Sequence, residues 1–119
     1  MDTTTREHWA YRQIRDFAED RRDWLRRVMA DKDLEATHRL IGVAIGLRTN
    51  HETEKSWPSI KRIALDTATS PRTVIRAIKI LAGEDGTEEK PGKGKNYLKV
   101  QRRKRGGNQY SLHFPWADK

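Results

Sequence analysis

The fold of this chain is decided by residues 57–83, WPSIKRIALDTATSPRTVIRAIKILAG. Ser59 follows a Trp-Pro pair and is placed to N-cap a short helix, because its hydroxyl accepts a hydrogen bond from an amide of the first turn. Ser70 is a second N-cap, and Pro71 suits the first position of the next helix. Gly83 provides a C-terminal stop. This stretch predicts two short helices joined by a turn of about four residues.

Each of the two predicted helices has one apolar face. The residues expected to face inward are Ile60, Ile63 and Ala64 in the first helix, and Val74, Ala77, Ile78 and Leu81 in the second. The second helix has a basic and small-polar outward face, made of Arg72, Thr73, Arg76 and Lys79. This is the helix-turn-helix pattern, in which the second helix enters the major groove of DNA.

An alternating pattern after residue 96 predicts a β-hairpin. Its apolar positions are Leu98 and Val100 on the first strand, and Tyr110, Leu112 and Phe114 on the second. A three-residue loop, Gly106-Gly107-Asn108, brings these apolar faces together. The predicted pairs are Val100 with Phe114, Arg102 with Leu112 and Lys104 with Tyr110. The basic run from Arg102 to Arg105 would then form the hairpin tip rather than a disordered tail.

The charge of the chain is concentrated near this hairpin. The 119 residues contain 25 Lys and Arg against 17 Asp and Glu, a net charge of +8. Residues 87–119 carry nine of the basic residues and three of the acidic ones. A polyanion is therefore the first partner to expect. The absence of cysteine excludes a disulfide scaffold, a Cys-ligated zinc site and thiol chemistry.

Two helices are predicted before residue 57. A capping box of Thr4 with Glu7 begins an amphipathic helix over residues 5–30. An N-cap within Asp31-Lys32-Asp33 begins the next, over residues 34–49. We expect its inward stripe to contain Leu40, Ile41, Ala44 and Leu47. Gly42 and Gly46 indicate a close approach by a neighbouring backbone.

The remaining segments are predicted to be loops. Residues 50–56 are polar, and residues 84–96 have no periodicity, so we interpret the latter as a mobile loop. Its two Gly-Lys pairs lack the glycine and the Ser or Thr that a phosphate-binding loop requires. The length suits one domain, which we place at residues 33–119, with residues 1–32 as an N-terminal amphipathic helix. We found no signal peptide and no apolar run long enough for a membrane, so a cytoplasmic protein is expected.

The order of helix, Trp57-Pro58-Ser59, helix-turn-helix and basic hairpin resembles the winged helix-turn-helix domains of bacterial, plasmid and phage regulators and replication initiators. The resemblance covers about residues 34–114. It implies a fold that is mainly α with a small β-hairpin, to which this chain adds a long N-terminal helix. That family often has glycine in the turn where this chain has Ala68, so we expect a wider turn here.

The resemblance also implies which residues face double-stranded DNA. They are Ser70, Arg72, Thr73 and Arg76 on the recognition helix, and Arg103, Lys104, Arg105 and Asn108 on the wing. Lys79 joins them from its outward position.

Three functions remain open at this point. The first is transcription regulation by sequence-specific DNA binding. The alternatives are replication initiation and a protein-interaction adaptor built on a winged-helix scaffold. No His, Ser or acidic residue has a catalytic context, so neither enzyme activity nor a cofactor nor a metal is expected. The N-terminal helix could pack on its own domain or act as a dimer arm.

Overall fold

Four helices and three short strands make up the computed structural model. It describes the backbone of residues 3–103 and 107–114, and side chains from Phe17 onward outside the same gap. In chain order the elements are α1 (Thr3–Ala30), α2 (Ala36–Arg48), β1 (Lys55–Ser56), α3 (Ile60–Thr67), α4 (Pro71–Leu81), β2 (Leu98–Gln101) and β3 (Gln109–Leu112). The fold is mainly α with a small antiparallel sheet and a long N-terminal helix, as the sequence predicts.

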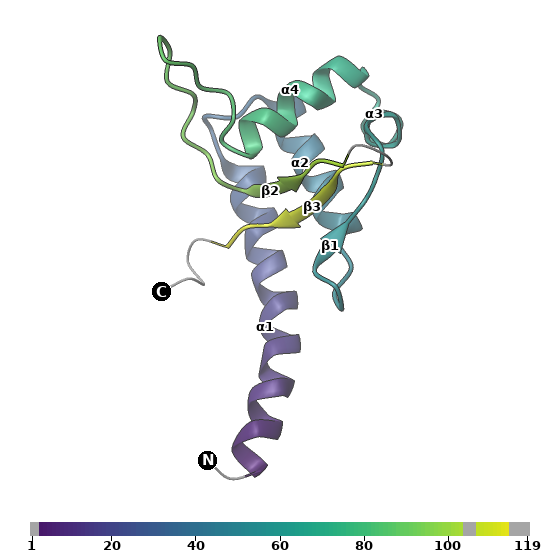
Figure 1. Ribbon diagram of the computed structural model, residues 1–119, viewed down its shortest axis with the longest axis vertical. Coiled ribbons are helices and arrows are strands. Elements are labelled where there is room, and N and C mark those ends of the chain that lie inside the picture. The colour runs from purple at the N-terminus through teal and green to yellow at the C-terminus, as the bar shows by residue number, and fades with distance from the viewer. Residues whose placement is uncertain (1–2, 104–106, 115–119) are drawn as a thin grey trace.

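The helix α1 extends well beyond the core of the molecule. Figure 1 shows α2, α3, α4 and the sheet gathered around its C-terminal half, while its N-terminal half extends away from them. Phe17, Trp24 and Val28 of the C-terminal half are buried. The longest dimension of the molecule, 52 Å, follows from this extension. Half of α1 is thus part of the core.

Two glycines bring α1 and α2 into close contact. A Cβ atom on Gly46 would lie 2.8 Å from both Leu25 Cδ2 and Trp24 Cζ3. A Cβ atom on Gly42 would lie 3.0 Å from Val28 Cγ1. The first distance is shorter than carbon atoms tolerate without displacement. The structure therefore confirms the close approach that the glycine spacing indicates.

The structure corrects the prediction of which α2 residues face inward. The side that packs inward contains His38, Ile41, Gly42, Ile45 and Gly46. Leu40 and Leu47, which we expected to be inward, are 49% and 65% exposed. The prediction of these two residues is wrong because counting only large apolar side chains ignores glycines. The glycines in fact define the side that the neighbouring helix can approach most closely.

The helix-turn-helix unit forms as its N-caps predict. Ser59 Oγ accepts a hydrogen bond from the Arg62 amide at 2.9 Å, and Ser70 Oγ accepts one from the Thr73 amide at 3.2 Å. Pro71 is the first residue of α4. Ile63 and Ala64 on α3, and the four predicted inward residues of α4, are buried.

The turn between α3 and α4 is not widened by its alanine, contrary to our expectation. Ala68 takes the left-handed conformation, with φ 54° and ψ 43°, and its amide donates to the carbonyl of Ala64. The cost for a non-glycine residue is about 1–2 kcal/mol. The next amide, of Thr69, also donates to the Ala64 carbonyl, at 3.0 Å. The turn therefore keeps a tight geometry and its hydrogen bonds offset the conformational cost.

The hairpin has the predicted apolar side but a different register. Leu98 pairs with Leu112 and Val100 pairs with Tyr110, not with Phe114. The hairpin connection accordingly runs from residue 102 to residue 108, longer than the three residues predicted. Side-chain alternation fixes only the parity of a register, so a shift of the partner by four residues preserves the apolar face. The two other predicted pairs, of Arg102 and Lys104, fail for the same reason.

A third strand completes the sheet. The sheet order is β1-β3-β2, and Ser56 of β1 pairs with Tyr110 of β3. The sequence prediction placed β1 in a loop, because a two-residue strand carries no alternation of its own. This strand joins the segment before α3 directly to the hairpin.

The predicted starts of α1 and α2 also need correction. Thr4, expected as an N-cap, lies inside α1. The residue before α2 is Glu35, whose side chain makes no capping hydrogen bond. Asp31 instead accepts a hydrogen bond from the Asp33 amide at 3.0 Å and pairs with residues of a distant loop. An aspartate between two helices is thus used for a long-range contact rather than for a cap.

Candidate nucleic-acid interface

The helix α4 presents a basic face to solvent. Five of its apolar residues are buried beneath it, Ile75 is 46% exposed, and Arg72, Arg76 and Lys79 are exposed. Its sequence, PRTVIRAIKIL, contains no acidic residue. In Figure 1, α4 lies across the top of the molecule, over the sheet and the upper end of α1. The side of α4 that faces away from the core is therefore exposed to solvent.

Ser70 and Thr73 have structural contacts in addition to their predicted role. The two hydroxyl oxygens lie 2.9 Å apart, within hydrogen-bond distance, at the start of α4. Ser70 also provides the N-cap described above. Ser70 is exposed and Thr73 is half-buried. These two side chains therefore fix the first turn of α4 at the place where Arg72 emerges.

The wing residues lie partly outside the described structure. Lys104 and Arg105, both predicted to contact DNA, fall outside the described residues. Arg103 Nη2 donates to Gln109 Oε1 at 2.9 Å, and Asn108 Nδ2 donates to the Tyr110 hydroxyl at 3.2 Å. Burial raises the pKa of Tyr110, so this hydroxyl stays protonated at neutral pH. Arg103 and Asn108 are thus both held by neighbours in β3.

The wing approaches the segment before α3. Trp57 Nε1 donates to the same Gln109 oxygen at 3.3 Å. A Cβ atom on Gly107 would lie 3.7 Å from the Trp57 carbonyl oxygen. Trp57 is 46% exposed although it is large and apolar. The start of α3 and the wing therefore form one continuous surface around this indole.

Arg102 forms an ion pair with Glu84. Its guanidinium donates to both carboxylate oxygens of Glu84, at 2.9 and 2.8 Å. The hydrogen bonds from Arg102 lower the pKa of Glu84, and the same bonds raise the pKa of Arg102. Glu84 follows α4 in the chain. This pair links the end of α4 to the first residue of the wing.

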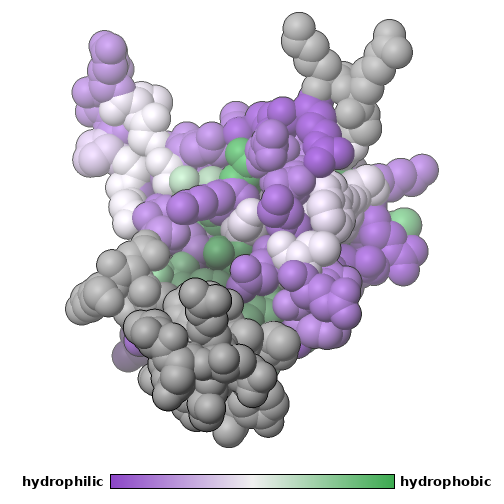
Figure 2. All heavy atoms as spheres, turned by 60° about the horizontal axis from the view of Figure 1, so that its bottom comes forward, coloured by the Kyte–Doolittle hydropathy of each residue, from purple (hydrophilic) through white to green (hydrophobic). Residues whose placement is uncertain are grey.

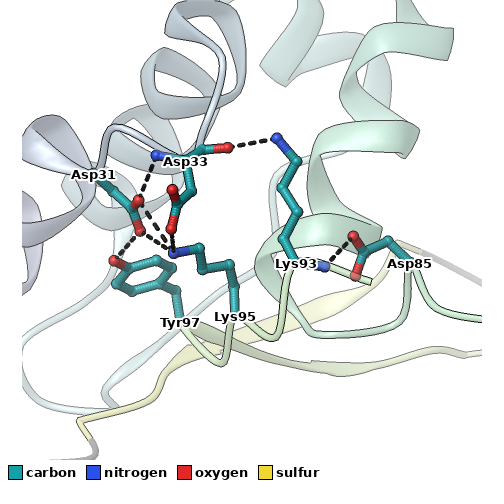
Figure 3. A network of polar contacts seen from close by, with 6 residues as sticks. All are labelled: Asp31, Asp33, Asp85, Lys93, Lys95 and Tyr97. Carbon is teal, nitrogen blue, oxygen red and sulfur yellow. Dashed lines mark hydrogen bonds and ion pairs between the residues drawn. The ribbon is translucent and has the colours of Figure 1, made fainter. Parts of the chain in front are cut away.

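A second polar network fixes the loop that leads to the wing. Figure 3 shows Lys95 between two carboxylates: its Nζ lies 2.9 Å from Asp31 Oδ2 and 3.0 Å from Asp33 Oδ2. The Tyr97 hydroxyl donates to Asp31 Oδ2 at 2.6 Å. Lys93 donates its ammonium to the Asp33 carbonyl and its amide to Asp85. Residues 84–96 contain no helix or strand, as predicted, but this network anchors their C-terminal end.

The ionisation of this network follows from its contacts. Burial acts to raise the pKa of Asp31, but hydrogen bonds from Lys95 and Tyr97 outweigh it, and the pKa is lowered. The two aspartates raise the pKa of Lys95. Burial and the hydrogen bond to Asp31 raise the pKa of Tyr97 to about 12. At neutral pH the Asp31 carboxylate is therefore ionised, beside the Lys95 ammonium and the neutral Tyr97 phenol.

Sequence reasoning missed the residues that hold the interface together. Glu84, Gln109 and Tyr97 were not singled out, although each links segments far apart in the chain. The only available signal was the position of Glu84, a carboxylate directly after a basic helix. The contacts of Gln109 and Tyr97 depend on the register of the hairpin, which alternation alone leaves open.

The described residues contain neither a metal-binding cluster nor a membrane-spanning helix. Within residues 17–103 and 107–114, no group of three or more His, Cys, Asp or Glu side chains is arranged to hold a metal ion. In that same part of the chain, no helix is long and apolar enough to cross a membrane.

Comparison with known proteins identifies the central segment. Residues 32–83 match the family model described as a helix-turn-helix domain. The match begins just before α2 and ends after α4, so it contains the two capped helices described above. No curated protein and no solved structure matches the chain.

Proposed function

We propose that this helix-turn-helix protein binds double-stranded DNA in a sequence-specific manner. In this proposal α4 enters the major groove, where Arg72, Thr73 and Arg76 contact base edges. Lys79 and the wing residues Arg103, Lys104, Arg105 and Asn108 contact the phosphate backbone. The observation that carries the proposal is the exposed face of α4, which holds Arg72, Arg76 and Lys79 and no acidic residue, directly after a tight, capped turn.

The surrounding carboxylates support this function by their positions. Asp66 at the end of α3 binds Arg48 at 2.6 Å and Arg62 at 3.2 Å. Glu84 is taken up by Arg102, as described above. Within the described residues, neither Arg72 nor Arg76 forms an ion pair. Their charge is therefore available to phosphates and guanines, which attract unpaired guanidinium groups most strongly.

We propose transcription regulation in a bacterium, plasmid or phage as the biological role, with replication initiation as the alternative. Both roles need the same duplex contacts, and both would place the protein in the cytoplasm with its DNA. The contacts proposed here involve no catalysis, and we propose that the protein is not an enzyme and uses no cofactor.

Salt dependence of DNA binding tests the proposal. About six to eight phosphate contacts would give a slope of log Kd against log salt of magnitude about 5–7. Fluorescence anisotropy on a labelled mixed-sequence duplex, repeated over a series of potassium chloride concentrations, measures this slope. A slope near zero, or no binding at low salt, would exclude DNA as the partner.

A protein-interaction adaptor is the second candidate function. A shallow groove of about 440 Å³ lies between α2 and α3, lined by Leu40, Val43, Ala44, Leu47, Arg48, Asp66 and Thr67. Leu40 and Leu47 are the exposed leucines noted above. An apolar groove of this kind is typical of a surface that another protein covers. This candidate predicts that a partner protein binds equally well when the basic residues of α4 are replaced.

We also propose that the protein is a homodimer through α1. The N-terminal half of α1 extends beyond the core in Figure 1, and its sequence continues the amphipathic pattern. Pairing with a second copy would cover that apolar pattern and present two α4 helices to a palindromic site.

The test removes residues 1–15, which leaves the buried residues Phe17, Trp24 and Val28 in place. The full chain should sediment as a dimer and the shortened chain as a folded monomer. A monomeric full chain would contradict the dimer arm and favour a local packing role for the helix.

A further inference from the structure

The side chain of Gln109 connects three segments of the interface. Its Oε1 atom accepts hydrogen bonds from Trp57 Nε1 and Arg103 Nη2, and its Nε2 atom donates to Gln101 Oε1 at 3.1 Å. The residue is only 8% exposed. It therefore joins the segment before α3, the end of β2 and the first part of the wing from a buried position.

The three contacts together fix the orientation of the Gln109 amide. Two donors converge on its oxygen, while its nitrogen finds an acceptor on the neighbouring strand. A rotation of the amide by 180° would face the NH₂ group toward two donors and lose all three bonds. The bond from Arg103 is charge-assisted and the strongest of the set. The amide oxygen is thus a fixed anchor for a guanidinium group.

This anchor acts on the one basic wing residue that remains available to DNA within the described structure. Arg102 is bound to Glu84, so its charge is already neutralised. Arg103 is exposed and meets a neutral partner, so it keeps its full charge while one of its nitrogens is immobilised. A long side chain that is ordered before binding loses less conformational entropy when it contacts a phosphate.

We infer that Gln109, held by Trp57, is a positioning residue that orders Arg103 for contact with the DNA backbone. The inference rests on the proposed DNA binding and assigns Trp57 a role through its indole N–H rather than through its ring alone. The occupant of the site is a phosphodiester of the duplex, recognised by the guanidinium nitrogens that do not bind Gln109.

A double-mutant cycle tests this inference. Kd would be measured on a mixed-sequence duplex of about 20 base pairs, two helical turns, for Gln109→Met and Arg103→Ala alone and combined. Gln109→Met should weaken binding about three- to tenfold in the wild-type chain. In the Arg103→Ala background the same change should weaken binding by less than about twofold, because the residue it positions is absent.

Two further variants separate positioning from a general structural effect. Ser111→Ala changes a side chain two residues further along β3 that takes no part in the Gln109 contacts, and it should leave Kd within about twofold. Trp57→Phe keeps the aromatic ring, removes the N–H donor and spares the buried amide. It should weaken binding, and this loss should also disappear in the Arg103→Ala background. If Gln109→Met fails to fold, as judged by its thermal transition, the Trp57→Phe cycle decides.

The outcomes distinguish this inference from the proposed function. Equal losses with and without Arg103 would overturn the positioning role while leaving DNA binding intact. A wild-type chain that binds no duplex at any salt concentration would overturn both.

Discussion

Arg102 and Glu84 form a two-pronged ion pair that joins the end of α4 to the start of the wing. Each guanidinium nitrogen bonds a separate carboxylate oxygen, at 2.9 and 2.8 Å. Bidentate pairs of this kind fix geometry as well as charge. Both side chains are nearly half exposed, so the pair lies at the surface beside the wing. The pair therefore limits the charge that the wing offers to DNA.

Replacement of Glu84 should increase that charge. In Glu84→Gln, Arg102 loses its neutralising partner and becomes one more cation beside the duplex. The salt slope of DNA binding should steepen by about 1, with tighter binding at low salt. Glu88→Gln makes the same charge change in the exposed loop and should leave the slope unchanged. Weaker binding by Glu84→Gln would instead show that the pair is needed to hold the wing in place.

Two substitutions of Ser70 should separate its capping role from its DNA-facing role. Ser70→Ala removes the acceptor for the Thr73 amide and should lower the free energy of unfolding by about 0.5–2 kcal/mol. Ser70→Asp keeps a capping oxygen and should preserve stability, but its carboxylate should repel phosphates and weaken DNA binding about tenfold. Urea denaturation and anisotropy measure the two effects. Equal binding by the Ser70→Asp variant and the wild type would place Ser70 away from DNA.

Arg72 and Arg76 should determine sequence preference. Loss of a bidentate contact to a base costs about 1–3 kcal/mol of discrimination, so Arg72→Ala and Arg76→Ala should bind the selected site less well but random duplex almost normally. Arg103→Ala should weaken binding to both. Lys32→Ala removes a positive charge in the α1–α2 connection and is the matched control. Binding-site selection followed by affinity measurement tests the difference. Parallel losses on both duplexes would mean that α4 does not contact bases.

A side chain at position 46 should lower the free energy of unfolding. The added methyl group in Gly46→Ala would overlap Leu25 and Trp24, at a cost of about 1–3 kcal/mol. The better helix propensity of alanine offsets up to about 1 kcal/mol of this. We expect a net loss in the free energy of unfolding of about 1–2 kcal/mol, measured by urea denaturation. Leu47→Ala on the exposed side should change stability by less than about 0.5 kcal/mol.

Tyr97 should make the protein sensitive to alkaline pH. Its pKa is raised to about 12 in the folded chain, above the ordinary value of 10.0. A raised pKa contributes stability that is fully present below pH 10 and is lost as the pH rises toward 12. Melting temperatures of the wild type and Tyr97→Phe should therefore converge over this range. The two aspartates also raise the pKa of Lys95, and the stability that this contributes falls at high pH in both proteins. A constant difference would show that the phenol does not titrate with folding.

Local signals in the sequence predict the helix-turn-helix unit well. Ser59, Ser70 and Pro71 act within one turn of the backbone that they cap, so their effect needs no knowledge of the rest of the fold. The inward residues of α4 follow from periodicity for the same reason. The identity of the basic face of α4 could thus be predicted before its position was known.

The errors occur where distant segments decide the outcome. The true register of Val100 depends on contacts across the sheet and on the short strand β1, which alternation cannot detect. The inward side of α2 is set by α1 through Gly46, not by its own leucines. The role of Gln109 needs both the register and the position of Trp57. These features arise from tertiary contacts, which local patterns do not contain.

The contacts of Tyr97 have a consequence for the order of folding. Its carbonyl accepts a hydrogen bond from the Trp24 indole at 2.8 Å, across 73 residues of chain, and its hydroxyl bonds Asp31 across 66. Contacts with such sequence separation form late, because a long loop must close before they stabilise anything. We expect α1, although it precedes the other described helices in the chain and packs on α2, to be among the last to complete its contacts. Until residue 97 has been synthesised, its tryptophan has no partner for the indole N–H, and the nascent domain exposes an unfinished core.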